Sequence, residues 1–164
     1  MSDKHDYIAV FDSGVGGISV LRHLVKQMPG ERYLYFGDSA NAPYGSRPTQ
    51  EVRDLTLAAA EKLYREYPVK ALVVACNTAT AAAIEDLRRA YPDRIIIGIE
   101  PAVKPAALTT KSGVIGVLAT KRSLEGDHFR RAEEKYGAEV RILKAVGEGF
   151  VEAVENNEEQ SPET

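Results

Sequence analysis

The amino-acid sequence predicts an α/β protein with an open parallel sheet flanked by helices, followed by the start of a second, similar α/β lobe. Short apolar runs rich in β-branched residues recur along the chain, and each is followed by a segment with helical spacing of its apolar residues. The runs are almost continuously apolar, which is typical of strands buried on both faces. The alternation pauses near residues 100–110 and then resumes, which favours a hinge between two lobes.

Six segments of the sequence are expected to be strands: 7–11, 33–36, 72–74, 94–99, 114–118 and 139–143. The first, Tyr-Ile-Ala-Val-Phe, and the fourth, Arg-Ile-Ile-Ile-Gly-Ile, are the clearest apolar runs. Because each run is short and bounded by turn residues, a strand is favoured over a helix.

The expected helices are the segments 18–28, 48–67, 78–90 and 121–136, with a further start at 150–155. The first has an apolar face and is stopped by Pro29 and Gly30, and the second is opened by Pro48. Pro105 interrupts the pattern, so no helix is expected around it. These elements predict a first lobe over residues 1–99, an incomplete second lobe over 100–155, and a polar tail or truncation point at 156–164.

Composition restricts the class of protein. The chain has 164 residues, is 44% hydrophobic and carries a net charge of −3, with charges of both signs interspersed. This argues against a surface for nucleic acid or an anionic membrane. A single cysteine forms no internal disulfide, and there is no Cys and His cluster with metal-ligand spacing. Without an apolar leader or a long apolar span, we expect a cytoplasmic protein with no metal.

That single cysteine, Cys76, falls on the turn between the third strand and its helix. A helix N-terminus offers unpaired N–H groups and a partial positive charge, so we expect a depressed pKa for the Cys76 thiol there. Asn77 and Thr78 follow and either cap the helix or contact a ligand. The alternative is a buried cysteine that acts as a small inert hydrophobe.

Two loops also follow strands. The first, Asp12–Gly17, has three glycines and either brings backbone N–H groups to an anion or forms a tight turn capped by Asp12 or Ser13. Its spacing matches no nucleotide-binding motif. The second, 37–46, carries Asp38, Asn41 and Tyr44 and is longer than most strand-to-helix connections. It is either a functional loop or an ordinary surface loop in which Tyr44 packs over the sheet edge.

Three segments together carry a family resemblance. They are AVFDSGVGGISVLR near the start, YFGDSANAPYG in the second loop and VVACNTATAAA at the third strand, with GFVEAVE as a fourth match near the end. In this order and spacing they closely resemble the glutamate racemase family of amino-acid racemases. The resemblance implies two α/β lobes with the substrate between them, no cofactor, and interconversion of L- and D-glutamate for peptidoglycan.

The resemblance also implies a role for each matched residue. Cys76 resembles one of two catalytic cysteines on opposite faces of the substrate α-carbon. Asp12 and Ser13 resemble the pair that meets the substrate ammonium group and orients the thiol. The residues that resemble contacts of the substrate carboxylate are Tyr44, Gly45, Asn77 and Thr78. Asp38 and Glu155 resemble acidic residues of the same cleft, and such racemases often form homodimers.

The sequence departs from the family in one respect. Members run about a hundred residues further, by resemblance, and carry a second cysteine in a Gly-Cys-Thr-His context that has no counterpart in the 164 residues. We therefore expect a fragment that lacks the second catalytic thiol, so that a two-base mechanism cannot run on Cys76 alone. Two alternatives stay open. One is a non-catalytic fragment that binds a small carboxylate or a partner chain, or only misfolds, and the other is a one-thiol relative that decarboxylates an activated diacid.

Overall fold

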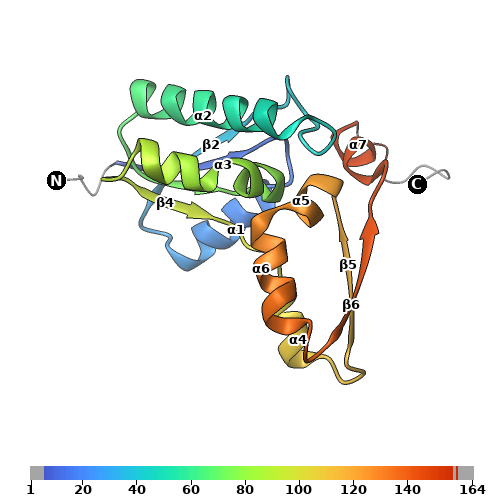
Figure 1. Ribbon diagram of the computed structural model, residues 1–164. Helices are drawn as coiled ribbons and strands as arrows, with labels where there is room; N and C mark the ends of the chain where they lie inside the picture. The colour runs from blue at the N-terminus through green and yellow to red at the C-terminus, as the bar shows by residue number, and fades with distance from the viewer. Residues whose placement is uncertain (1–5, 157, 159–164) are drawn as a thin grey trace.

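The computed structural model describes residues 6–156 and residue 158, and the strands among them form two separate parallel sheets (Figure 1). The first sheet has the order β2-β1-β3-β4. Its strands are β1 (Tyr7–Asp12), β2 (Arg32–Gly37), β3 (Val69–Val74) and β4 (Ile95–Gly98). The second sheet pairs β5 (Val114–Ala119) with β6 (Arg141–Val146). The predicted α/β class with a parallel sheet is confirmed.

Strand β1 lies at the centre of the first sheet, where Phe11 pairs with Phe36 of β2 and with Val74 of β3. Its side chains alternate between two cores. Phe11 belongs to the core under one face of the sheet, whereas Ile8 and Val10 belong to the core under the other. Because both faces are covered, the strand is apolar from Tyr7 to Phe11, as its sequence indicated, and its last residue is Asp12.

Three helices cover the first sheet, and with it they form the first unit, residues 7–98. They are α1 (Ile18–Gln27), α2 (Thr49–Glu66) and α3 (Asn77–Ala90). Figure 1 shows α2 and α3 together on one face of the sheet and α1 on the other. Helix α1 has no fully buried residue, and Ile95 and Ile97 of β4 remain 60% and 51% exposed. The α1 face is therefore the more thinly covered of the two.

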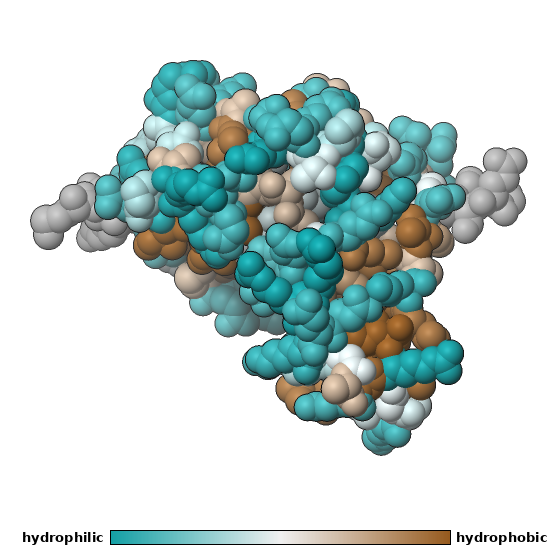
Figure 2. Space-filling view, viewed as in Figure 1, coloured by the Kyte–Doolittle hydropathy of each residue, from teal (hydrophilic) through white to brown (hydrophobic). Residues whose placement is uncertain are grey.

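The second unit, residues 103–155, consists of β5, β6 and four helices. The helices are α4 (Val103–Thr109), α5 (Lys121–Glu125), α6 (Asp127–Tyr136) and α7 (Phe150–Glu155). Its core gathers Val103, Ile115, Phe129, Tyr136 and Val140. In Figure 2 hydrophobic side chains also gather at the surface over β5 and β6.

The helices of the second unit differ from the sequence expectation at two points. Helix α4 was not expected, but Pro105 is only its third residue, where the helix needs no backbone N–H. The helix expected over 121–136 is two helices, because Gly126 adopts an extended backbone with φ −71° and ψ 150° between them. The helix start at 150–155 is confirmed as α7.

The expected tail at 156–164 lies outside the described residues except for residues 156 and 158. Within the described part of the chain, no helix combines the length and apolar character needed to cross a membrane.

Candidate active site

A cavity of about 610 Å³ lies where the carboxyl ends of β1 and β3 meet the second unit. Parallel α/β sheets place ligand sites at this edge, because the loops and helix N-termini that follow the strands converge there. Eight of the predicted site residues line it: Asp12, Ser13, Tyr44, Gly45, Cys76, Asn77, Thr78 and Glu155. The ninth, Asp38, is not on its wall.

Cys76 is the N-cap residue of α3, and its Sγ atom accepts a hydrogen bond from the backbone N–H of Ala79 at 3.4 Å. Its Sγ also lies 3.4 Å from the hydroxyl of Ser13, in a contact where either atom can donate. The side chain is 7% exposed and lies on the cavity wall. The sulfur is thus in contact with polar groups of the first loop and is not enclosed by aliphatic side chains alone.

The protonation of Cys76 differs from the sequence expectation. Burial raises the pKa of the Cys76 thiol, and the negative charge of Asp12 raises it further. The hydrogen bonds with Ser13 and Ala79 act in the opposite direction but are outweighed. The expected depression of the pKa by the helix N-terminus was therefore wrong, and the resting form at neutral pH is the thiol.

Asp12 is buried at the end of β1 and organises the glycine-rich loop. Its Oδ2 accepts hydrogen bonds from the N–H groups of Gly14 and Gly17, both at 3.1 Å. A Cβ atom on Gly17 would lie 2.7 Å from the Cβ of Asp12, so glycine permits this close approach. The loop is a tight turn around its own aspartate, and these two N–H groups are not available to an external anion.

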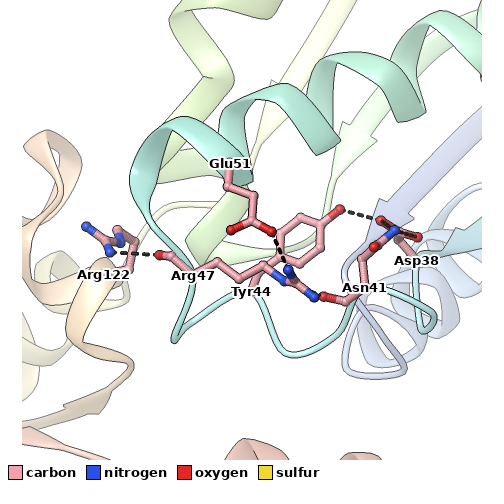
Figure 3. A network of polar contacts seen from close by, with 6 residues as sticks. All are labelled: Asp38, Asn41, Tyr44, Arg47, Glu51 and Arg122. Carbon is pink, nitrogen blue, oxygen red and sulfur yellow. Dashed lines mark hydrogen bonds and ion pairs between the residues drawn. The ribbon is translucent and has the colours of Figure 1, made fainter.

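The second loop presents backbone groups to the cavity. The Tyr44 side chain is buried, and its hydroxyl donates to Asp38 Oδ2 at 2.6 Å, as Figure 3 shows. Burial and the bond to Asp38 raise the pKa of Tyr44. In the described part of the chain the N–H groups of Tyr44 and Gly45 donate no hydrogen bond. A ligand carboxylate would therefore meet these N–H groups and not the phenol.

The first turn of α3 supplies further donors. The N–H of Ala79 is occupied by the sulfur, whereas those of Asn77 and Thr78 have no partner among the described residues. Such N–H groups at a helix N-terminus favour an anion. The buried Thr78 hydroxyl instead contacts Thr120 of the second unit at 3.1 Å.

Glu155 of α7 lies across the cavity from the sulfur-bearing helix. Its Oε1 accepts a hydrogen bond from the N–H of Val15 at 3.2 Å, so it joins the second unit to the first loop. The carboxylate packs directly over Gly14, where a Cβ atom would lie 1.8 Å from Oε1. Asp12 and Glu155 are the two carboxylates on the wall of the cavity.

Apart from Glu155, sequence reasoning missed the residues that the second unit contributes. The cavity is also lined by Leu118, Thr120, Ser123, Phe150 and Val154. One signal was present: Thr120 lies between a strand and a helix, as Cys76 does, and its hydroxyl caps α5 by accepting from the N–H of Ser123 at 3.2 Å. The apolar residues carry no such signal, because only tertiary packing brings them to the site.

The arrangement combines a thiol, two carboxylates and unpaired backbone donors in one cavity. This set suits a small zwitterion, with carboxylates for its ammonium group and N–H groups for its carboxylate. Over the residues described here, no group of three or more His, Cys, Asp or Glu side chains is placed to hold a metal ion.

The fold and the cavity together define a class of α/β protein in which a cysteine and an aspartate, at the ends of adjacent parallel strands, face one ligand site. The chain belongs to the Asp/Glu/Hydantoin racemase family, whose sequence model matches residues 8–164.

Individual relatives agree with this assignment. The chain is 50% identical over 156 residues to a glutamate racemase of Clostridium acetobutylicum, covering 95% of this chain and 60% of the relative. It is 46% identical to one of Stutzerimonas stutzeri, covering all of this chain and 62% of the relative. The chain thus spans about 60% of the length of the curated relatives it matches.

Solved structures show the same fold. The crystal structure of Escherichia coli glutamate racemase with L-glutamate and the activator UDP-MurNAc-ala superposes with a TM-score of 0.86 at 31% identity. That match covers 93% of this chain and 57% of the other. The glutamate racemase isoform RacE1 of Bacillus anthracis gives a TM-score of 0.82 at 36% identity, with coverages of 94% and 57%.

Proposed function

We propose that the cavity binds glutamate and that Cys76 transfers a proton at its α-carbon, as one half of the interconversion of L- and D-glutamate that supplies D-glutamate for peptidoglycan. The observation that carries the proposal is the contact of Cys76 with Ser13 beside Asp12, in a cavity with unpaired N–H donors on two sides. The 50% identity to a glutamate racemase supports the choice of substrate.

In the proposed complex, the carboxylates of Asp12 and Glu155 attract the substrate ammonium group. The α-carboxylate lies against the N–H groups of Asn77 and Thr78 or those of Tyr44 and Gly45. These donors compensate the charge that develops when the α-proton leaves. Asp38 acts indirectly, because its carboxylate holds the hydroxyl of Tyr44.

The proton transfer itself requires Cys76 in one of two forms. As a thiolate it takes the α-proton: the S–H bond forms, the Cα–H bond breaks, and the electron pair stays on the α-carbon. As a thiol it returns a proton to that carbanion from the same face. Because the raised pKa keeps the resting Cys76 protonated, the thiol must lose its proton before it can take one from glutamate. Inversion requires a second acid on the opposite face, and the sequence holds one cysteine.

The experiment is incubation of the chain with L-glutamate in deuterated water, followed by NMR and chiral analysis. We expect deuterium at Cα without inversion, and loss of exchange in Cys76→Ser. Exchange that survives this substitution removes Cys76 from the reaction, and inversion shows that a second acid is already present. If no exchange occurs but glutamate protects Cys76 from an alkylating reagent, the alternative is supported: the chain is a fragment that only binds a small carboxylate.

We also propose that the chain folds as two lobes that divide near residue 99, that it works in the cytoplasm, and that it self-associates. Val114, Leu118 and Leu143 lie on one face of the β5–β6 sheet and are 38%, 60% and 48% exposed, which favours association. Sedimentation velocity tests this, and a monomer at every concentration contradicts it.

A further inference from the structure

Arg122 of α5 connects the second unit to the loop that carries Tyr44 and Gly45. Its Nη2 donates to the backbone carbonyl of Arg47 and its Nη1 to the hydroxyl of Thr49, both at 2.7 Å. Figure 3 shows the guanidinium reaching from its helix to the end of the loop. Arg47 lies in the connection between β2 and α2, and Thr49 is the first residue of α2, so one side chain fixes the loop at the point where it joins the helix.

The loop is closed upon itself, so fixing one end fixes the rest. The Nε of Arg47 donates to the carbonyl of Asn41 at 2.7 Å, and the N–H of Arg47 donates to the carbonyl of Tyr44 at 3.2 Å. Asn41 and Tyr44 in turn both donate to the Asp38 carboxylate. Figure 3 shows these bonds as one connected set. Segment 38–47 is therefore held as one body.

The contact also has a feature that stability alone does not explain. The Nε of Arg122 is buried and has no hydrogen-bond partner within the described residues. An unpaired buried N–H is unfavourable, and an apolar side chain of similar length would avoid it. What arginine adds is a rigid planar fork whose two separate nitrogens reach two acceptors at once, whereas lysine donates from a single nitrogen and methionine from none.

The fork acts close to the cavity. A Cβ atom on Gly45 would lie 2.8 Å from Cγ2 of Thr120, which immediately precedes α5. Thr120 contacts Thr78 on α3 at 3.1 Å. The position of α5 relative to the loop therefore sets how closely the Tyr44 and Gly45 N–H groups approach the donors at the start of α3.

We propose that Arg122 is a positioning residue that holds segment 38–47 against the cavity, so that the N–H groups of Tyr44 and Gly45 meet the ligand carboxylate. The identity of that ligand as glutamate rests on the proposed function, whereas the effect of Arg122 on the cavity does not. Arg122 does not line the cavity and acts on it only through the loop.

The test uses Cys76 as the reporter, because it is the only cysteine in the sequence. The rate of its alkylation by iodoacetamide measures access to the cavity, and protection by L-glutamate measures binding. In Arg122→Met we expect alkylation about fivefold faster and half-protection at about tenfold higher glutamate, as for the loss of one or two hydrogen bonds. Arg122→Lys, which donates from a single nitrogen and lacks the fixed fork, should fall between this variant and the wild type.

The control is Arg130→Met, because Arg130 is an exposed arginine of α6 that pairs with Asp127 on the same helix. It should leave both quantities unchanged. Thr49→Val removes one acceptor only and should shift both in the same direction by a smaller factor.

The proposal is overturned if Arg122→Met and Arg130→Met show the same rate of Cys76 alkylation and the same protection by glutamate. The proposal is also overturned if Arg122→Met has a lowered melting temperature while Thr49→Val leaves the alkylation rate of Cys76 unchanged. Arg122 would then only stabilise the fold. If glutamate fails to protect even the wild type, the proposed function fails, and the alkylation rates still decide the role of Arg122.

Discussion

Replacing Gly17 with alanine tests how tightly the first loop is built around Asp12. The new methyl group would lie 2.7 Å from the Cβ of Asp12 and 3.0 Å from the Cβ of Ala75. Neither Cβ can rotate away, because each is attached directly to the backbone at the end of a central strand. Gly17 has φ −65° and ψ −11°, which alanine adopts without strain, so the effect is steric.

The magnitude follows from two opposing effects. Overpacking of this kind costs about 1–3 kcal/mol, and the reduced entropy of the unfolded chain returns about 0.4–1 kcal/mol. A net loss of about 1–2 kcal/mol lowers the melting temperature by roughly 2–8 °C in a chain of this size. The hydrogen bonds of Asp12 with Gly14 and Gly17 should lengthen as the carboxylate is displaced.

Thermal unfolding followed by circular dichroism measures the effect, with Gly30→Ala as the matched control. A Cβ atom on Gly30 would meet no atom within 4 Å, so that variant should melt at or above the wild-type temperature. If Gly17→Ala melts within about 1 °C of Gly30→Ala, the loop has room for a methyl group and the steric reasoning is refuted.

Three further substitutions test the charge and packing arguments. Asp12→Asn removes a negative charge that raises the Cys76 pKa, so the pH midpoint of alkylation should move to lower pH; no shift would contradict the assigned cause. Ser13→Ala removes a hydrogen bond that lowers this pKa, so the same assay should show a move to higher pH, and a move downward would show that the bond stabilises the thiol instead. Phe129→Ala should cost about 3–5 kcal/mol in denaturant unfolding because Phe129 is 1% exposed, whereas Phe150→Ala, at 49% exposed, should cost less than half as much. Equal losses would mean that Phe129 is not central to its core.

Much of the first unit could be predicted from local sequence, because β1 and most of β3 are buried on both faces and carry short apolar runs. Strand β3 begins at Val69, earlier than the expected segment 72–74. The charged Lys70 hid this start in the sequence, although Val69 before it is buried. In the second unit, Gly126 separates two helices where the sequence suggested one. A Cβ atom there would lie 2.7 Å from the Cβ of Ala81 in α3, a contact between distant segments that no local pattern records.

The candidate site was predictable in its location and less so in its chemistry. Strand ends identified Asp12 and Cys76, because residues there reach a common edge of the sheet. The protonation of Cys76 depends on burial and on the charge of Asp12, which outweigh the local helix N-terminus. Likewise, sequence shows a tyrosine at position 44 but not that Asp38 binds its hydroxyl, which leaves the backbone as the free donor.

The central place of β1 has a consequence for synthesis on the ribosome. Among the described elements this strand emerges first, yet its second neighbour, β3, ends at Val74, roughly 60 residues later. At about 5–20 residues per second, the nascent chain spends roughly 3–12 seconds with β1 open along one edge. Asp12 and Cys76 meet only when that edge is filled, so assembly of the thiol–carboxylate pair and completion of the central ladder are the same folding event.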